Sequence, residues 1–214
     1  MKTITGEPLH LSITHTESVH QEWCTLDQAK AWLRVTTDDE DSTIEALIPA
    51  VRRKVETDTR RAMAPATVVM SVDGAPVGWP AVPYDWTGAN VSPMLILPIG
   101  PAASVTSIKS YSTANVESTL ATSVYRLDGD SLPPRIVLKD GQSWPSNLRP
   151  QTSMVITYQT GGRPVPAELL QAARLLLAHW WVNREAVQVG GVIMNTPTSL
   201  AYDALIGPLK VAWL

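Results

Sequence analysis

The sequence predicts an α+β protein in which a helical bundle, formed by both chain ends, carries an inserted small antiparallel β domain. Helical periodicity occupies residues 25–62 and 166–206, whereas residues 67–159 have the pattern of short strands separated by Pro and Gly. Each helical end offers only two or three amphipathic elements, so we expect their apolar faces to bury each other. The expected organisation is an N-terminal arm, a two-segment helical core and a β-rich insert, at residues 1–24, 25–64 with 163–214, and 65–162.

Two capping boxes predict where the first two helices begin. Thr25 precedes Gln28 by three residues, and Ser42 and Glu45 repeat the pattern. Pro49 lies inside the second helix and predicts a kink or a new helical segment there. The second helix nevertheless carries an apolar stripe that continues on both sides of the proline, formed by Ile44, Leu47, Ile48, Val51 and Val55.

The middle of the chain predicts an antiparallel sheet because no alternation of strand and helix occurs there. Asp73-Gly74 indicates a turn, and residues 74–93 are a Pro-rich loop. A brief apolar alternation between Leu9 and Ile13 predicts an edge strand. The other strand candidates are 67–72, 94–98, 104–111, 115–120, 123–127, 135–139 and 153–159.

The most hydrophobic helix is expected after Pro166, which fits the first turn of a helix. Leu169, Ala173, Leu176 and Trp180 recur at helical spacing there and predict a core-facing stripe. A last short helix is expected at 199–206, before Gly207-Pro208.

The bulk composition excludes several classes of function. The 214 residues contain no apolar run of about 18 residues, so we expect no membrane span. The single cysteine, Cys24, excludes an internal disulfide, and the net charge of −3 argues against a generic nucleic-acid binder.

No catalytic or cofactor motif is visible, so we expect no enzyme and no cofactor. There is no G-x-S-x-G elbow and no Walker motif, and His179 lies in an apolar helix where a core histidine is the default. The rival from another class is a hydrolase whose nucleophile and base are scattered along the chain. It predicts a deep pocket that joins His179 to a carboxylate.

Three histidines and the only thiol lie close together near the N-terminus, at His10, His15, His20 and Cys24. Zinc uses such ligands, but these spacings match no compact finger. We therefore expect no metal site, and elemental analysis would settle the alternative of a metal-binding module.

Two charged clusters and an apolar tail are candidate contact sites. The charged side chains have two interpretations, a solvated helix face or a head-to-tail interface between subunits. The interface candidates are Asp38, Asp39, Asp41, Arg52, Arg53, Arg60 and Arg61. The tail could dock on its own molecule or on a partner, through Leu209, Val211, Trp213 and Leu214.

Four stretches resemble the head–tail connector, or adaptor, proteins of long-tailed bacteriophages and gene transfer agents. They are TLDQAKAWLRV (25–35), DDEDSTIEALI (38–48), VETDTRRA (55–62) and LLLAHWWVNREAVQVGG (175–191). The resemblance runs from about residue 25 to the C-terminus, and the middle matches by layout more than by sequence. Pro49 and the loop 74–93 depart from the family pattern.

The resemblance implies a structural part of the virion, present in the host cytoplasm before assembly. Such a part forms a homo-oligomeric ring, commonly of twelve copies, docks on the portal protein and receives a stopper or tail completion protein. DNA passes through its lumen without specific binding. We hypothesise that the tail 208–214 anchors to the portal. The alternative from the same class is a tail or baseplate component, and only a partner test separates the two.

Overall fold

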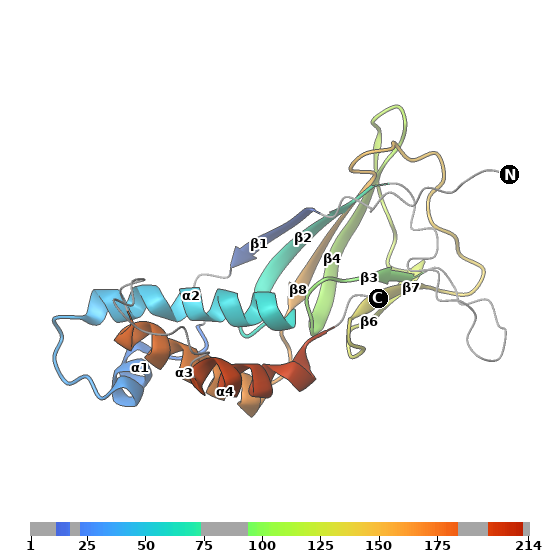
Figure 1. Cartoon of the computed structure of the whole chain (residues 1–214). Coiled ribbons are helices and arrows are strands. Elements are labelled where there is room, and N and C mark those ends of the chain that lie inside the picture. The colour runs from blue at the N-terminus through green and yellow to red at the C-terminus, as the bar shows by residue number, and fades with distance from the viewer. Residues whose placement is uncertain (1–11, 18–21, 74–93, 184–196, 212–214) are drawn as a thin grey trace, which may run out of the picture. The chain divides into compact units, whose positions relative to one another are not determined.

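The computed structural model describes residues 12–17, 22–73, 94–183 and 197–211 (Figure 1). The chain divides into two compact units. One unit, called the β unit below, comprises residues 1–18 and 65–162 with Leu214. The other, called the helical unit, comprises residues 19–64 and 163–213. Helices and antiparallel sheets occur together, so the predicted α+β class is confirmed.

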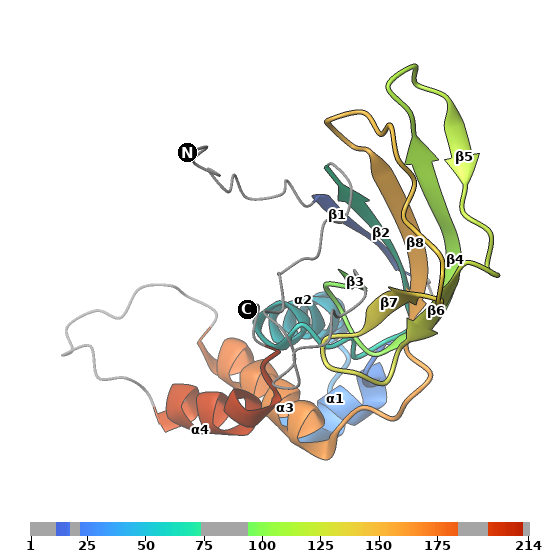
Figure 2. The ribbon, with the colours of Figure 1, turned by 90° about the vertical axis from the view of Figure 1, so that its right-hand side faces the viewer.

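The β unit contains two antiparallel sheets. The larger has the strand order β1-β2-β8-β4-β5, visible in Figure 2, and the smaller has the order β3-β7-β6. The first sheet consists of β1 (Ser12–Glu17), β2 (Ala66–Val72), β8 (Met154–Thr160), β4 (Ala102–Tyr111) and β5 (Glu117–Thr119). The second consists of β3 (Met94–Ile96), β7 (Arg135–Leu138) and β6 (Tyr125–Asp128).

The core of the β unit follows from strict alternation along its two central strands. In β2 and β8 every second side chain is buried, because successive side chains of a strand point to opposite faces. Val68 pairs with Tyr158 and Met70 with Ile156. The Tyr158 hydroxyl, fully buried, donates to the Ile99 carbonyl at 3.1 Å and accepts from the Ile99 amide at 3.2 Å.

The predicted strands from 67–72 to 153–159 agree with β2 to β8 to within a few residues. The edge strand expected at Leu9–Ile13 lies later, at Ser12–Glu17, where it pairs with β2. All six residues of β1 pair with β2, from Ser12 opposite Ser71 to Glu17 opposite Ala66. The turn expected at Asp73-Gly74 and the loop 74–93 lie outside the described residues beyond Asp73.

The helical unit contains α1 (Leu26–Leu33), α2 (Asp41–Thr59), α3 (Ala167–Val182), α4 (Pro197–Ile206) and a 3-10 turn, η1 (Gly207–Leu209). Side chains from before and after the β insert share one hydrophobic cluster. Its fully buried members include Ile44, Val51 and Val55 of α2, Leu169 and Leu177 of α3, and Ile206 of α4.

Only one of the two capping boxes predicted from the sequence forms. At α1 the Thr25 hydroxyl accepts from the Gln28 amide at 3.2 Å, and the Gln28 side chain accepts from the Thr25 amide at 3.1 Å. The Ser42 box is wrong, because the N-cap of α2 lies two residues earlier, at Glu40, which makes no side-chain capping bond, and the helix begins at Asp41. Asp41 is held there by an ion pair with Lys30.

Pro49 neither ends α2 nor starts a new segment, since one helix runs from Asp41 to Thr59. A proline in a helix removes one donor. Ile48 and Val51 on either side of it are almost completely buried, so their packing offsets that loss.

The two capping boxes make a matched pair for mutation. We expect Thr25→Ala to lower the free energy of unfolding by about 0.5–2 kcal/mol, because it removes the cap of α1. Ser42→Ala removes no capping bond and should change stability by less than about 0.5 kcal/mol. Urea unfolding monitored by circular dichroism measures both, and equal losses would contradict the assignment of the caps.

Candidate functional site

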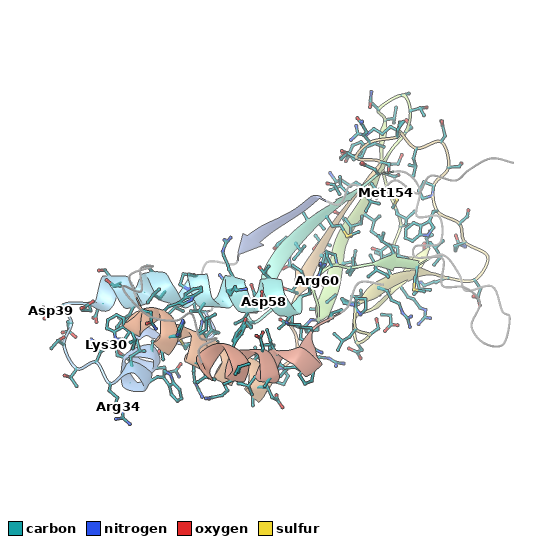
Figure 3. All side chains as sticks on the ribbon, in the orientation of Figure 1. Lys30, Arg34, Asp39, Asp58, Arg60 and Met154 are labelled. Atoms are coloured by element: carbon teal, nitrogen blue, oxygen red, sulfur yellow. The ribbon has the colours of Figure 1, made fainter. Side chains whose placement is uncertain are left out.

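The acidic run after α1 is tied to its own chain by Lys30. The Lys30 Nζ lies 2.6 Å from Asp38 Oδ1 and 2.7 Å from Asp41 Oδ1. These contacts raise the pKa of Lys30 and lower the pKa of Asp38. Asp39 is exposed, and Figure 3 shows it with Lys30 at the end of the helical unit where α2 begins. Asp38 and Asp41 therefore form ion pairs with Lys30, and Asp39 is the exposed member of the three predicted acidic interface residues that is outside these pairs.

Arg52 corrects the expectation that the basic residues of α2 lie on a solvated face. It is only 3% exposed. Its Nε lies 2.9 Å from Glu22 Oε2, and its Nη1 lies 3.1 Å from Glu56 Oε2 one turn along the helix. The Glu56 Oε1 also accepts from the Met63 amide at 2.7 Å. Arg52 is thus a buried link between the segment before α1, α2 and the segment after α2.

The other basic candidates occupy three different settings. Arg53 is exposed on α2, whereas Arg60 and Arg61 are half-buried and burial lowers the pKa of both guanidinium groups. Arg60 ends α2 in the left-handed conformation, with φ of 57°, and its amide donates to the Glu56 carbonyl at 2.7 Å. The Arg61 Nε donates to the Leu209 carbonyl at 2.8 Å. The structure therefore does not bring these four arginines together as one patch.

The described part of the C-terminal tail contacts its own chain. Leu209 is half-buried against the helical cluster, and its carbonyl accepts the bond from Arg61. The Val211 amide donates to the Thr59 carbonyl at 3.2 Å. Trp213 and Leu214, the other two tail candidates, lie outside the described residues.

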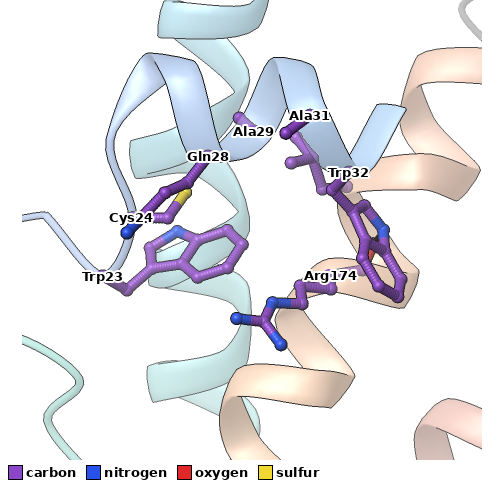
Figure 4. A pocket seen from close by; sticks show the side chains of 8 residues that line it. Trp23, Cys24, Gln28, Ala29, Ala31, Trp32 and Arg174 are labelled. Atoms are coloured by element: carbon purple, nitrogen blue, oxygen red, sulfur yellow. Dashed lines mark hydrogen bonds between the residues drawn. The ribbon is translucent and has the colours of Figure 1, made fainter. Parts of the chain in front are cut away.

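A pocket of about 410 Å³ opens between α1, the segment before it and α3 (Figure 4). Its lining is mainly apolar and includes the rings of Trp23 and Trp32. The Trp23 Nε1 donates to the Ile48 carbonyl at 3.0 Å, and the Trp32 Nε1 donates to the Arg174 carbonyl at 3.0 Å. The Arg174 guanidinium lies 5.6 Å from the centre of the Trp32 ring, within the range of a cation–π contact. The pocket therefore offers aromatic walls and one cation.

Sequence reasoning missed this pocket because its residues are distant along the chain. Trp32 and Arg174 are separated by 142 positions. The local signal was the pair of tryptophans, Trp23 just before the capped helix α1 and Trp32 in its last turn.

The pocket offers little for catalysis. Its thiol, Cys24, has a pKa raised to about 11, chiefly by burial and then by the Glu22 carboxylate, so it is a poor nucleophile at neutral pH. His179 does not line this pocket, and its ring contacts the Asn183 side chain at 3.2 Å. Among the residues that the structure describes, no group of three His, Cys, Asp or Glu side chains could hold a metal. None of the described helices combines the length and apolar character of a bilayer-spanning helix.

The raised pKa of Cys24 predicts slow alkylation. At pH 8 a thiol with a pKa of about 11 holds roughly 100-fold less thiolate than one at the ordinary 9.0. We expect iodoacetamide to modify the folded protein at least about 100-fold more slowly than the same protein unfolded in urea. Mass spectrometry of timed samples gives both rates. Equal rates in the two states would show that the thiol is neither buried nor perturbed.

These observations place the chain among two-unit α+β proteins, and its described residues hold no cluster of possible metal ligands. Comparison with known proteins agrees, since residues 24–85 match the family model of the phage gp6-like head-tail connector protein. The predicted likeness to head–tail connectors is thereby confirmed. None of the curated proteins is similar to this chain at a significant level.

Three solved structures of gene transfer agent (GTA) particles contain a chain with this fold. The neck of an empty particle, computed with C6 symmetry, matches with 22% identity, a TM-score of 0.69 and coverage of 95% of this chain and 97% of the other. The virion of a native particle matches with 21% identity, a TM-score of 0.64 and coverage of 94% and 96%. The neck of a native particle, computed with C12 symmetry, matches with 24% identity, a TM-score of 0.60 and coverage of 94% and 97%.

Proposed function

We propose that this protein is a structural head–tail connector, or adaptor, of a virion, located at the interface between head and tail. The observation that carries the proposal is the agreement of two comparisons. A connector family model matches α1, α2 and β2, and the fold of a neck chain matches along nearly the whole length of both proteins. A non-enzymatic role agrees with the raised pKa of the Cys24 thiol and with the mainly apolar lining of the pocket.

In this function the protein forms a ring, docks on the portal protein and receives a stopper or tail completion protein below. The symmetry of the related necks, C6 and C12, supports twelve copies in the ring. The lumen frames the exit channel of the DNA. A net charge of −3 suits a channel wall that lets DNA pass without specific binding.

The connector core in this proposal is formed by residues 25–64 and 163–214, which make up most of the helical unit. Its shared cluster of apolar side chains, drawn from both sides of the β insert, gives it the rigidity that a ring subunit needs. The exposed Asp39 and Arg53 remain candidates for contacts with ring neighbours, where exposed pairs set register more than affinity.

Co-sedimentation with particles tests the function. Purified protein is mixed with DNA-filled heads that carry a portal but lack a neck, and with heads that lack the portal. We expect saturable binding at about twelve copies per portal-bearing head, in keeping with the C12 neck, and no binding to the portal-less control. Equal binding to both kinds of head would overturn the proposal.

The C-terminal tail supplies the portal anchor in the same proposal. Leu209 and Val211 are already engaged with the helical unit, so the free energy of docking must come mainly from residues 212–214. Deleting these three residues leaves both contacts intact. We expect about tenfold or greater loss of affinity for portal-bearing heads, as for the loss of one buried Trp or Leu side chain. Unchanged occupancy in the co-sedimentation assay would show that the anchor lies elsewhere.

A further inference from the structure

The pocket of the helical unit is open to a partner. Trp32 is 41% exposed although it is a large aromatic side chain, and Arg174 is also exposed. In Figure 4 the Arg174 side chain extends between the indoles of Trp23 and Trp32. An aromatic slot with a cation at its mouth fits an apolar side chain that is accompanied by a carboxylate.

Helix α4 of the same unit carries such a pair of side chains on its outer face. Leu200 is 62% exposed, and the Asp203 side chain is 64% exposed. Leu200, Asp203 and Ala204 follow the spacing i, i+3 and i+4, which places them on one side of α4, and Gly207, the first residue of η1, continues the spacing at i+7. This set is called the α4 face below. The opposite side of α4 is anchored, since Tyr202 and Ile206 are buried in the helical cluster.

The α4 face is shaped for close approach. Ala204 and Gly207 are small, and a side chain added at Gly207 would meet no atom within 4 Å. Among the described residues, Asp203 pairs with Lys210 at a long distance of 4.0 Å, and its side chain is 64% exposed. The face therefore combines an exposed leucine, an accessible carboxylate and little steric bulk.

The pocket and the α4 face lie on different flanks of α3. Helix α1, which forms one wall of the pocket, packs on α2 and α3, and α4 packs on α3 and η1. Figure 2 shows α4 and α1 on opposite sides of α3. With α3 between them, the α4 face of one copy is placed to meet the pocket of a second copy and not its own pocket.

We propose that the α4 face of one copy docks in the pocket of the next, with Asp203 paired to Arg174 and Leu200 packed between the indoles of Trp23 and Trp32. Because the two surfaces differ, the contact is heterologous, and repetition closes a ring when the rotation permits. The inference rests on the proposed ring function and assigns its subunit interface. It assigns the main contact to α1, α3 and α4, and the exposed Asp39 and Arg53 remain candidates for additional contacts between copies.

Covalent capture tests the contact without any other protein. Ala31 lines the pocket and is exposed, and Ala204 is exposed on the α4 face. The variant Cys24→Ser/Ala31→Cys/Ala204→Cys therefore places one thiol on each side of the contact. A short bis-maleimide joins the two thiols covalently, so that even short-lived contacts between copies of the full chain accumulate as cross-linked products. We expect a ladder of dimers, trimers and larger species on a denaturing gel.

Single-cysteine controls distinguish a heterologous contact between copies from a symmetric one. Each single-cysteine variant, in the Cys24→Ser background, can form dimers only through a symmetric contact, and we expect at most traces of them. A ladder from the double variant that is no stronger than in the controls would overturn the inference.

Charge reversal gives a second readout. Arg174→Glu or Asp203→Arg should each lower the ladder yield by roughly threefold or more, and the two together should restore it. Circular dichroism checks that each variant is folded. If the ladder yield were the same for Arg174→Glu, for Asp203→Arg and for the double variant as without these changes, the pairing of Asp203 with Arg174 would be contradicted.

The capture assay contains no portal, so its result is independent of the co-sedimentation test. A ladder without portal binding overturns only the connector function. Portal binding without a ladder overturns only the interface.

Discussion

Replacing Arg52 by alanine is expected to lower the free energy of unfolding by about 3–5 kcal/mol, the usual cost of removing one partner from a buried ion pair. Arg52 is 3% exposed and Glu56 is 8% exposed, so the variant leaves a carboxylate with little water and without its cation. Burial already raises the pKa of Glu56, even with the arginine present. The loss should be read from urea unfolding at pH 7.

The matched control for Arg52→Ala is the neighbouring residue. Arg53→Ala removes the same side chain from an exposed position and should change stability by less than about 0.5 kcal/mol. The double variant Arg52→Met/Glu56→Gln should recover much of the loss, because the amide oxygen of glutamine can still accept from the Met63 amide. A loss for Arg52→Ala that is as small as the loss for Arg53→Ala would show that the buried link does not form in solution.

Leu169→Ala is the second change with a large expected effect. Leu169 of α3 is fully buried in the cluster that also contains Ile44 and Val51 of α2. Truncation leaves a cavity between segments separated by the entire β insert, and we expect a loss of about 2–5 kcal/mol. Thermal or urea unfolding of the full chain measures it.

Leu200→Ala is the control for Leu169→Ala, since it makes the same chemical change on the exposed face of α4. It should alter stability by less than about 0.5 kcal/mol. If Leu169→Ala were equally mild, the helices from the two ends of the chain would not be packed as the structure has them.

Local patterns predicted the elements well where the determining interactions are local. The Thr25 capping box involves residues three positions apart, and α1 begins there. The alternation in β2 and β8 is a property of each strand alone, and both strands were predicted to within one residue of each bound.

The predictions from sequence were wrong where a tertiary contact determines the end of a helix or the burial of a side chain. The helix α2 begins at Asp41 and not after Ser42, and an ion pair with Lys30 of another helix holds that end. Arg52 directly follows Val51 of the apolar stripe in sequence, but it is buried and forms an ion pair with Glu22, which lies 30 positions away. No local pattern contains such information.

The candidate site was harder to predict than the fold for the same reason. The charged residues selected from the sequence occupy separate settings: the ion pairs of Lys30, the buried link of Arg52, the contact of Arg61 with the tail, and exposed positions. The pocket and the α4 face, in contrast, depend on the order in which helices pack around α3. Hydrophobic spacing indicates that a helix has a buried side, but it does not indicate which helix covers that side.

Electron cryomicroscopy of neckless, portal-bearing heads incubated with the protein would show whether it forms a ring at the portal. We expect an added annular layer at the portal vertex. Adjacent copies in that layer should be joined through α4 of one and the α1–α3 pocket of the next. A portal vertex that looks the same with and without the protein would contradict this expectation.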